Sequence, residues 1–177
     1  SMPIYQEYAR LYDRSGQLGF SMRMLRYISQ LLEAFPVHGN RLLDLACGTG
    51  TFAVGMALDG WQVQGEDGSA SMLEQAQAKT PDTVNITWSQ QDMRSFIADE
   101  PVHLVTCLYD SLNYMLTDDD LVAVFRHALA ALLPNGLFIF DMNTPWVLAN
   151  QWDDSTYMSE SDDLTSIMRS TYDDRIQ

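Results

Sequence analysis

The chain has 177 residues, of which 46% are hydrophobic, so it can enclose one full core and we expect a single domain over 1–177. Its formal net charge of -14 argues against nucleic acids and membranes as partners, because both are bound largely through Lys and Arg. No run approaches the roughly 20 apolar residues that cross a membrane, and no export signal opens the sequence, so we expect a cytoplasmic protein.

Helical and strand-like segments alternate in the first half of the chain. Apolar residues at helical spacing mark the helices, and short apolar runs mark the strands. Ser69 is suited to cap one helix, which should stop before Pro81. The expected elements are a helix over 20–35, a strand over 41–46, a helix over 52–58, a strand over 61–65 and a helix after Ser69.

The alternation continues in the second half. Thr117 and Asp120 resemble a capping box at the start of a helix, and Pro134-Asn135-Gly136 should turn the chain after that helix. The expected elements are strands over 84–88 and 102–108, a helix over 121–132 and a strand over 137–140.

This order of elements indicates the fold class. Parallel strands need crossover connections, which helices provide, and strands that are apolar throughout are covered on both faces. We therefore expect an α/β, doubly wound fold in which a mainly parallel sheet has helices on both faces. In such folds ligands bind at the carboxyl ends of the strands.

The stretch LLDLACGTG, residues 42–50, joins the first expected strand to a helix. Gly48 and Gly50 lack a Cβ, so a ligand can press against the backbone there, although a purely structural turn would use the same glycines. Gly48-x-Gly50-x-x-Ala53 also satisfies the loose dinucleotide pattern. Asp44 favours a cationic ligand instead, because a fixed carboxylate is unfavourable beside a pyrophosphate.

The segment Asp44-Leu45-Ala46-Cys47-Gly48-Thr49-Gly50 resembles the first motif of class I S-adenosylmethionine-dependent methyltransferases. The cofactor of that family carries an ammonium and a sulfonium, and this loop wraps its methionine end. The stretch 63–73 resembles the second-strand motif, which implies that Asp67 takes the ribose hydroxyls, with Glu66 as the neighbouring alternative. A carboxylate suits that role because charge-assisted hydrogen bonds are strong.

Two later segments resemble the family in the same order. Gln91-Asp92-Met93-Arg94 resembles the adenine segment, which implies that Asp92 accepts from the exocyclic amine and that Met93 covers the ring. The stretch 107–114 resembles the segment that lines the methyl-transfer site. The residues that the resemblance assigns to the cofactor are Asp44, Ala46, Cys47, Gly48, Gly50, Asp67, Gly68, Met72, Asp92, Met93 and Leu108.

The resemblance also reaches the acceptor side of the site. It extends to the Tyr5-x-x-Tyr8-Ala9-x-x-Tyr12-Asp13 start and to the strand over 137–143. Asp110 is the candidate general base for an acceptor that arrives protonated, and the alternative is a loop acid without a catalytic role. The residues expected to bind the acceptor are Tyr8, Tyr12, Tyr109, Asn113, Tyr114 and Trp146.

Two features depart from the family pattern. His103 stands where relatives usually carry an acid, and we interpret it as structural and not catalytic. The family fold continues through a helix and an antiparallel hairpin. In the Asp/Ser/Thr-rich tail we expect one strand over 164–172, paired as a hairpin with residues near Tyr157, which does not supply the whole of that hairpin and its helix. We expect residues 1–40 to form a helical cap, 41–143 the cofactor-binding core, and 144–177 the start of a substrate-covering insertion in a truncated chain. Alternatively, a partner completes the sheet.

The sequence thus predicts a methyltransferase that transfers a methyl group from S-adenosylmethionine to a nitrogen or oxygen of a small molecule, leaving S-adenosylhomocysteine. Cys47 and Cys107 lie far apart without a CxxC or Cys/His cluster, so we expect no metal site. The alternatives are a nicotinamide-dependent oxidoreductase and a binding module without catalysis. The oligomeric state stays open, a homodimer included.

Overall fold

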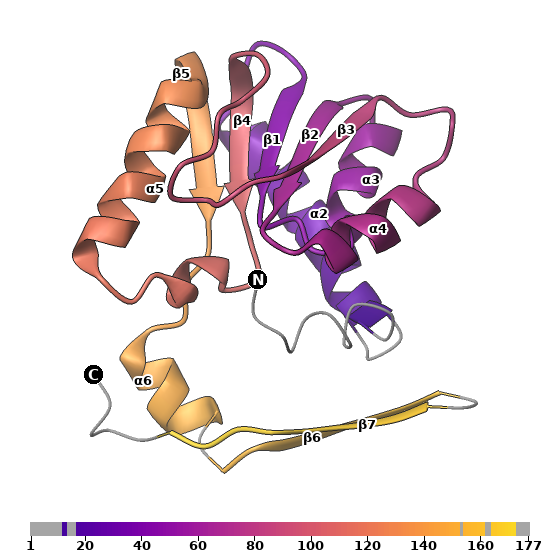
Figure 1. Ribbon diagram of the computed structural model, residues 1–177, viewed down its shortest axis with the longest axis vertical. Helices are drawn as coiled ribbons and strands as arrows, with labels where there is room; N and C mark the ends of the chain where they lie inside the picture. Colours follow the sequence, from indigo (N-terminus) through magenta and orange to yellow (C-terminus); the bar gives the residue numbers. More distant parts are fainter. Residues whose placement is uncertain (1–11, 14–16, 153, 162–163, 173–177) are drawn as a thin grey trace.

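A five-stranded sheet lies at the centre of the computed structural model, which describes residues 12–13, 17–152, 154–161 and 164–172 (Figure 1). The strand order is β3-β2-β1-β4-β5, and every neighbouring pair is parallel. This confirms the doubly wound α/β fold that the sequence predicts. The strands are β1 (Arg41–Leu45), β2 (Gln62–Asp67), β3 (Ile86–Gln90), β4 (Val102–Cys107) and β5 (Leu132–Phe140).

Helices cover both faces of the sheet (Figure 1). Side chains alternate across a strand, so neighbouring residues of β1 enter different cores. Leu42 packs in a cluster that includes residues of α2 and α3, whereas Leu43 packs in a cluster with residues of α5. The principal helices are α2 (Gln17–Ala34), α3 (Thr51–Leu58), α4 (Ala70–Lys79) and α5 (Asp118–Ala131).

Two helix starts are capped as the sequence predicts. The Ser69 hydroxyl accepts a hydrogen bond from the Met72 amide at the start of α4, over 3.4 Å. The Thr117 hydroxyl accepts from the Asp120 amide at the start of α5, over 3.1 Å. Each cap satisfies one of the free amides that a helix start leaves without a partner.

The start of β5 differs from the prediction. The sequence places a turn at Pro134-Asn135-Gly136 and a strand after it, but β5 already begins at Leu132. Val102 pairs with Leu132 and Leu104 pairs with Leu137, so the strand bulges between these pairs and contains the predicted turn. Asn135 retains turn geometry, with φ of 64°, and the bulge absorbs the extra residues.

The carboxyl-terminal part of the described chain stands apart from the sheet. β6 (Thr156–Ser161) and β7 (Leu164–Arg169) form an antiparallel hairpin of their own, which Figure 1 shows as an arm beyond the carboxyl ends of the strands. The sequence predicts this pairing of the 164–172 stretch with residues near Tyr157. It misses three short helical segments, η2 (Ser111–Tyr114), α6 (Pro145–Val147) and η3 (Leu148–Trp152).

Two kinds of feature are absent from the described residues. Within these ranges, no helix has both the length and the apolar character needed to cross a membrane. In the same part of the chain, no group of His, Cys, Asp and Glu is arranged to hold a metal ion.

Candidate active site

The carboxyl ends of the parallel strands bring the main predicted cofactor residues together. Asp44 of β1 lies level with Gly65 of β2 and with Thr106 of β4. The loop after β1 therefore runs beside the end of β2, where Asp67 stands, because parallel neighbours end at the same edge of a sheet. The Cys47 amide donates to the Glu66 carbonyl over 2.9 Å and holds the loop there.

The two glycines of this loop serve different purposes. Both have left-handed backbones, with φ of 55° at Gly48 and 74° at Gly50, which favour glycine. A Cβ at Gly50 would come within 2.4 Å of the Trp88 ring, so that position needs glycine for packing as well. A Cβ at Gly48 would have no atom of a described residue within 4 Å, so this backbone faces space that a ligand can fill.

Asp67 connects the glycine loop to the start of α4. Its carboxylate accepts a hydrogen bond from the Gly48 amide over 2.8 Å and another from the Ser69 amide over 2.7 Å. Burial raises the pKa of Asp67, and these two amide hydrogen bonds oppose the rise. The carboxylate is thus held in one orientation at the edge of the open space beside Gly48.

Glu66 lies in the interior and not at the loop. It is 2% exposed, and one of its oxygens accepts from Gln64 over 2.7 Å and from Gln91 over 2.9 Å. Burial raises its pKa to about 7. Of the two acids between which the sequence leaves the ribose role open, Asp67 is the one whose side chain is hydrogen-bonded to the glycine loop, whereas Glu66 meets the loop through its backbone carbonyl.

Asp44 is a buried acid that favours a cation nearby. Its side chain is 3% exposed, and the Thr106 hydroxyl donates to it over 2.7 Å. Burial raises its pKa to about 7, the Thr106 hydrogen bond opposes the rise, and the charge of Asp67 adds to it. A cationic ligand group at this end of the sheet would offset the cost of ionising Asp44.

The predicted adenine segment is held by an ion pair that the sequence analysis missed. Both carboxylate oxygens of Asp92 accept from the Arg94 guanidinium, over 2.9 Å and 2.6 Å. Arg94 lowers the pKa of Asp92 to about 2. Met93 packs against the core on the α5 face of the sheet. The adenine roles of Asp92 and Met93 stay predictions.

An unusual backbone turn follows β4 on the acceptor side. Tyr109 and Asp110 are consecutive left-handed residues, with φ of 64° and 52°. Such conformations are strained for residues other than glycine and persist where surrounding contacts hold them. Both amides donate to the carboxylate of Asp141, over 3.1 Å and 2.7 Å. Asp141, which the sequence analysis did not select, therefore holds this turn.

Asn143 completes the contacts between the ends of β4 and β5. Its backbone amide donates to the Asn113 side chain over 2.9 Å, and its own side chain donates to Asp110 over 2.9 Å. Burial raises the pKa of Asp110, the charge of Asp141 adds to the rise, and Asn143 opposes it. Asp141 directly follows the strand β5 and Asn143 comes two residues later, so polar residues at the end of an apolar strand are the signal that could have found them.

The remaining predicted residues are placed less centrally. The Met72 and Leu108 side chains are 3% and 2% exposed and belong to the core, so their cofactor contacts stay predictions. Tyr114 and Trp146 are exposed, and Trp146 lies on α6, outside the sheet edge. Tyr12 is half-buried. The Tyr8 prediction lies outside the described residues.

His103 lies at the opposite end of the sheet from these residues. It is in the second position of β4, where a ring nitrogen accepts from the Arg41 amide over 3.3 Å. That placement agrees with a structural role.

Comparisons with known proteins match this arrangement to one family. A family model described as "Methyltransferase domain" matches residues 42–136. The chain is 34% identical to YqeM of Bacillus subtilis (strain 168), a protein named as a methyltransferase without a stated acceptor, over 94% of this chain and 66% of YqeM.

Two further relatives carry more specific names. The dTDP-3-amino-3,6-dideoxy-alpha-D-glucopyranose N,N-dimethyltransferase of Streptomyces fradiae is 30% identical over 79% of this chain and 53% of that enzyme. The crystal structure of an S-adenosylmethionine-dependent methyltransferase from Clostridium acetobutylicum superposes with a TM-score of 0.76 at 24% identity, covering 97% of this chain and 70% of that one. The chain thus spans about two thirds of the length of YqeM and about half the length of the Streptomyces fradiae enzyme.

Proposed function

The chain belongs to the methyltransferase-domain family. From this premise we propose that it transfers a methyl group from S-adenosylmethionine to an amine nitrogen of a small-molecule acceptor. An oxygen acceptor is the alternative within the same reaction. The single observation that carries the proposal is the meeting of Asp44, Gly48 and Asp67 at the carboxyl ends of β1 and β2, beside the Tyr109 turn.

The residues present suit the cofactor. The open space at Gly48 admits a ligand against the backbone, buried Asp44 favours the ammonium and sulfonium, and Asp67 offers a carboxylate for the ribose hydroxyls. When bound, the cofactor supplies a methyl group already activated by its sulfonium. The protein therefore has to align the acceptor and exclude water, so positioning accounts for much of the acceleration.

Asp110 is the group that we assign to proton removal. An amine that arrives as an ammonium must lose a proton before it can act as a nucleophile. The raised pKa of Asp110 makes its carboxylate a better proton acceptor, and Asn143 holds that carboxylate by a hydrogen bond of 2.9 Å. Asp141 fixes the turn on which Asp110 stands.

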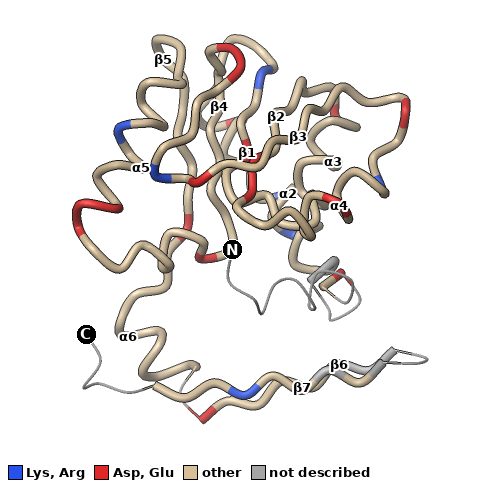
Figure 2. Tube along the Cα trace, viewed as in Figure 1, with Lys and Arg blue, Asp and Glu red and all other residues tan. Residues whose placement is uncertain are grey.

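The charge distribution favours a neutral or cationic amine over a polyanion. Figure 2 shows Lys and Arg scattered over the described residues, and no basic stripe that would follow a phosphate backbone. Lys79 and Arg94 are each paired with acids, namely Asp13 for Lys79, and Asp92 and Asp120 for Arg94. Neither of these two side chains is left to pair with a diphosphate on an acceptor, so we favour an amine without one. The aminosugar relative supports the choice of nitrogen.

Cofactor binding should depend on pH through Asp44, whose pKa is about 7 in the free protein. A bound ammonium favours the ionised carboxylate, so the complex holds fewer protons than the free protein. Affinity for S-adenosylhomocysteine should therefore rise with pH, by at most about tenfold per unit, and level off above about pH 7. Titration calorimetry between about pH 5.5 and pH 8 measures this.

Two variants assign the effect to one acid. Asp44→Asn should remove most of the pH dependence, because the amide cannot ionise. Glu66→Gln is the matched control, since Glu66 has a similarly raised pKa but lies away from the glycine loop. A pH dependence that disappears in Glu66→Gln and persists in Asp44→Asn would contradict the assignment.

The acceptor is tested with radiolabelled S-adenosylmethionine and a panel of acceptors. The panel contains neutral and cationic small amines, small alcohols, dTDP-linked amino sugars, tRNA and duplex DNA. We expect transfer of the labelled methyl group to small amines without a diphosphate, with a higher kcat/KM than for any dTDP-linked sugar. Label confined to tRNA or DNA would overturn the small-molecule proposal, and tight NAD binding without S-adenosylhomocysteine binding would favour the oxidoreductase.

A further inference from the structure

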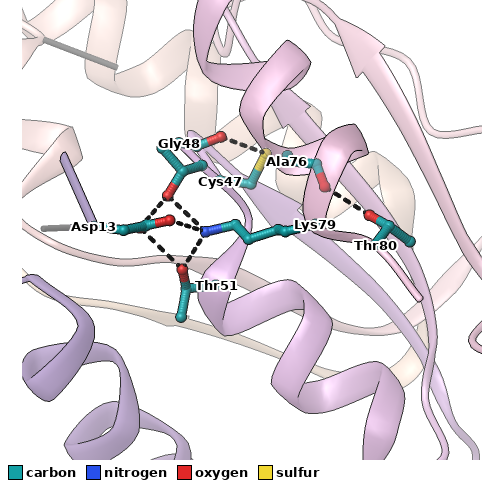
Figure 3. Close-up of polar contacts among 8 residues, drawn as sticks. Asp13, Cys47, Gly48, Thr51, Ala76, Lys79 and Thr80 are labelled. Carbon is teal, nitrogen blue, oxygen red and sulfur yellow. Dashed lines mark hydrogen bonds and ion pairs between the residues drawn. The ribbon is translucent and has the colours of Figure 1, made fainter. Parts of the chain in front are cut away.

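Lys79, at the end of α4, reaches the glycine loop and the N-terminal segment at once (Figure 3). Its ammonium donates to the Thr51 hydroxyl over 2.6 Å and to the Thr49 hydroxyl over 3.1 Å, and it forms an ion pair with Asp13. An ammonium has three N–H donors, so each donor of Lys79 has one acceptor in this cluster.

Asp13 closes the cluster from the other side. One of its oxygens accepts from Thr49 over 2.6 Å and from Thr51 over 3.2 Å, while the other pairs with Lys79. Each threonine hydroxyl thus accepts from the ammonium and donates to the carboxylate. Every donor in the cluster therefore has an acceptor, and the four side chains form one hydrogen-bonded network (Figure 3).

The network bears directly on the cofactor loop. Thr49 is 2% exposed and lies between Gly48, which faces the open space, and Gly50, which packs on Trp88. Gly50 stands in the N-cap position of α3 and provides no side-chain cap. The loop conformation therefore depends on contacts from elsewhere in the fold, and Asp67 and the Lys79 network provide them.

Asp13 also fixes the residue before it. The Tyr12 phenol lies close enough to Tyr109 to contribute to the raised pKa of that hydroxyl, whose main cause is burial. Tyr12 and Asp13 thus lie between the glycine loop and the turn after β4. Breaking the network would release both constraints together.

We propose that Asp13 and Lys79 are positioning residues that hold the glycine loop in its cofactor-binding conformation, without themselves touching the cofactor. This inference rests on the proposed function, because it concerns the same site. The exposed fractions of the two side chains are 35% for Asp13 and 28% for Lys79, so an isolated pair would contribute little. The buried Thr49 hydroxyl makes the pair part of a coupled network instead.

The test measures S-adenosylhomocysteine affinity by calorimetry for the wild type, Asp13→Asn, Lys79→Met and the double variant. Each single change should weaken binding by about fivefold to tenfold, the range that one coupled network produces. The double variant should bind about as weakly as either single variant, because the network is already broken. Amide hydrogen exchange at residues 48–50 should quicken in all three, while the melting temperature changes little.

The matched control is Glu100→Gln, which breaks a comparable exposed ion pair with Arg41 at the other end of the sheet. It should leave affinity and exchange at residues 48–50 unchanged. Wild-type affinity in the double variant, or losses that simply add, would overturn the proposal. If Lys79→Met fails to fold, Asp13→Asn decides alone. If the wild type binds no S-adenosylhomocysteine, the result contradicts the proposed function, and it is thereby distinguished from a result that contradicts the role of Asp13 and Lys79.

Discussion

Replacing Gly48 by Ala should weaken S-adenosylhomocysteine binding by about tenfold to a hundredfold, the 1–3 kcal/mol that an extra methyl group typically costs in a filled site. Among the described residues, the added Cβ would meet no atom within 4 Å, so it would project into the space that we assign to the cofactor. The left-handed φ of 55° should add about 1–2 kcal/mol of backbone strain without unfolding the domain. Calorimetry and thermal melting measure the two effects separately.

Substitutions at two other glycines distinguish the effect of backbone strain from the effect of filling the ligand space. Gly60 also has a positive φ, at 94°, and open space around its Cβ position, so Gly60→Ala should destabilise similarly and bind normally. Gly50→Ala should unfold the domain, because its Cβ would lie 2.4 Å from the Trp88 ring. Equal affinities for Gly48→Ala and Gly60→Ala would show that the space beside Gly48 is not the cofactor site.

Replacing Asp67 by Ala should lower the affinity for S-adenosylhomocysteine by at least about tenfold. A hydrogen bond to a charged group contributes about 1.5–3 kcal/mol, and the change removes those expected to the ribose. It also leaves the amides of Gly48 and Ser69 without their acceptor, so the glycine loop should loosen. Calorimetry gives the affinity, and amide exchange at Gly48 reports the loop.

Glu66→Gln distinguishes the two neighbouring acids in this test. Glu66 is bonded to Gln64 and Gln91 in the interior, so its change should leave the affinity at about pH 8 within about twofold of the wild type. A large loss in Glu66→Gln together with normal binding in Asp67→Ala would reverse the ribose assignment.

The sequence by itself determined the order of the elements and the position of the glycine loop between the first strand and its helix. Strand and helix periods depend on residues two to four positions apart, so local patterns placed β1 and α4 within a few residues. A helix cap such as Ser69 contacts an amide three residues later, so it too could be predicted from the local sequence. Asp67 was selected because the stretch 63–73 resembles the second-strand motif of the family, and its contact with Gly48 follows from parallel strands ending together.

Only the tertiary structure decided which acids face the site and what holds the loops. Whether the side chain of Glu66 or of Asp67 reaches the glycine loop depends on the register of β2 with β1 and β3. That register cannot be read from the sequence. The Asp141 contacts to the Tyr109 turn join residues 31 and 32 positions apart, and the Lys79 pair joins residues 66 positions apart. Such contacts exist because chain folding closes long loops, and no periodic pattern marks them in advance. The raised pKa of Asp44 has the same origin, since burial between β2 and β4 produces it.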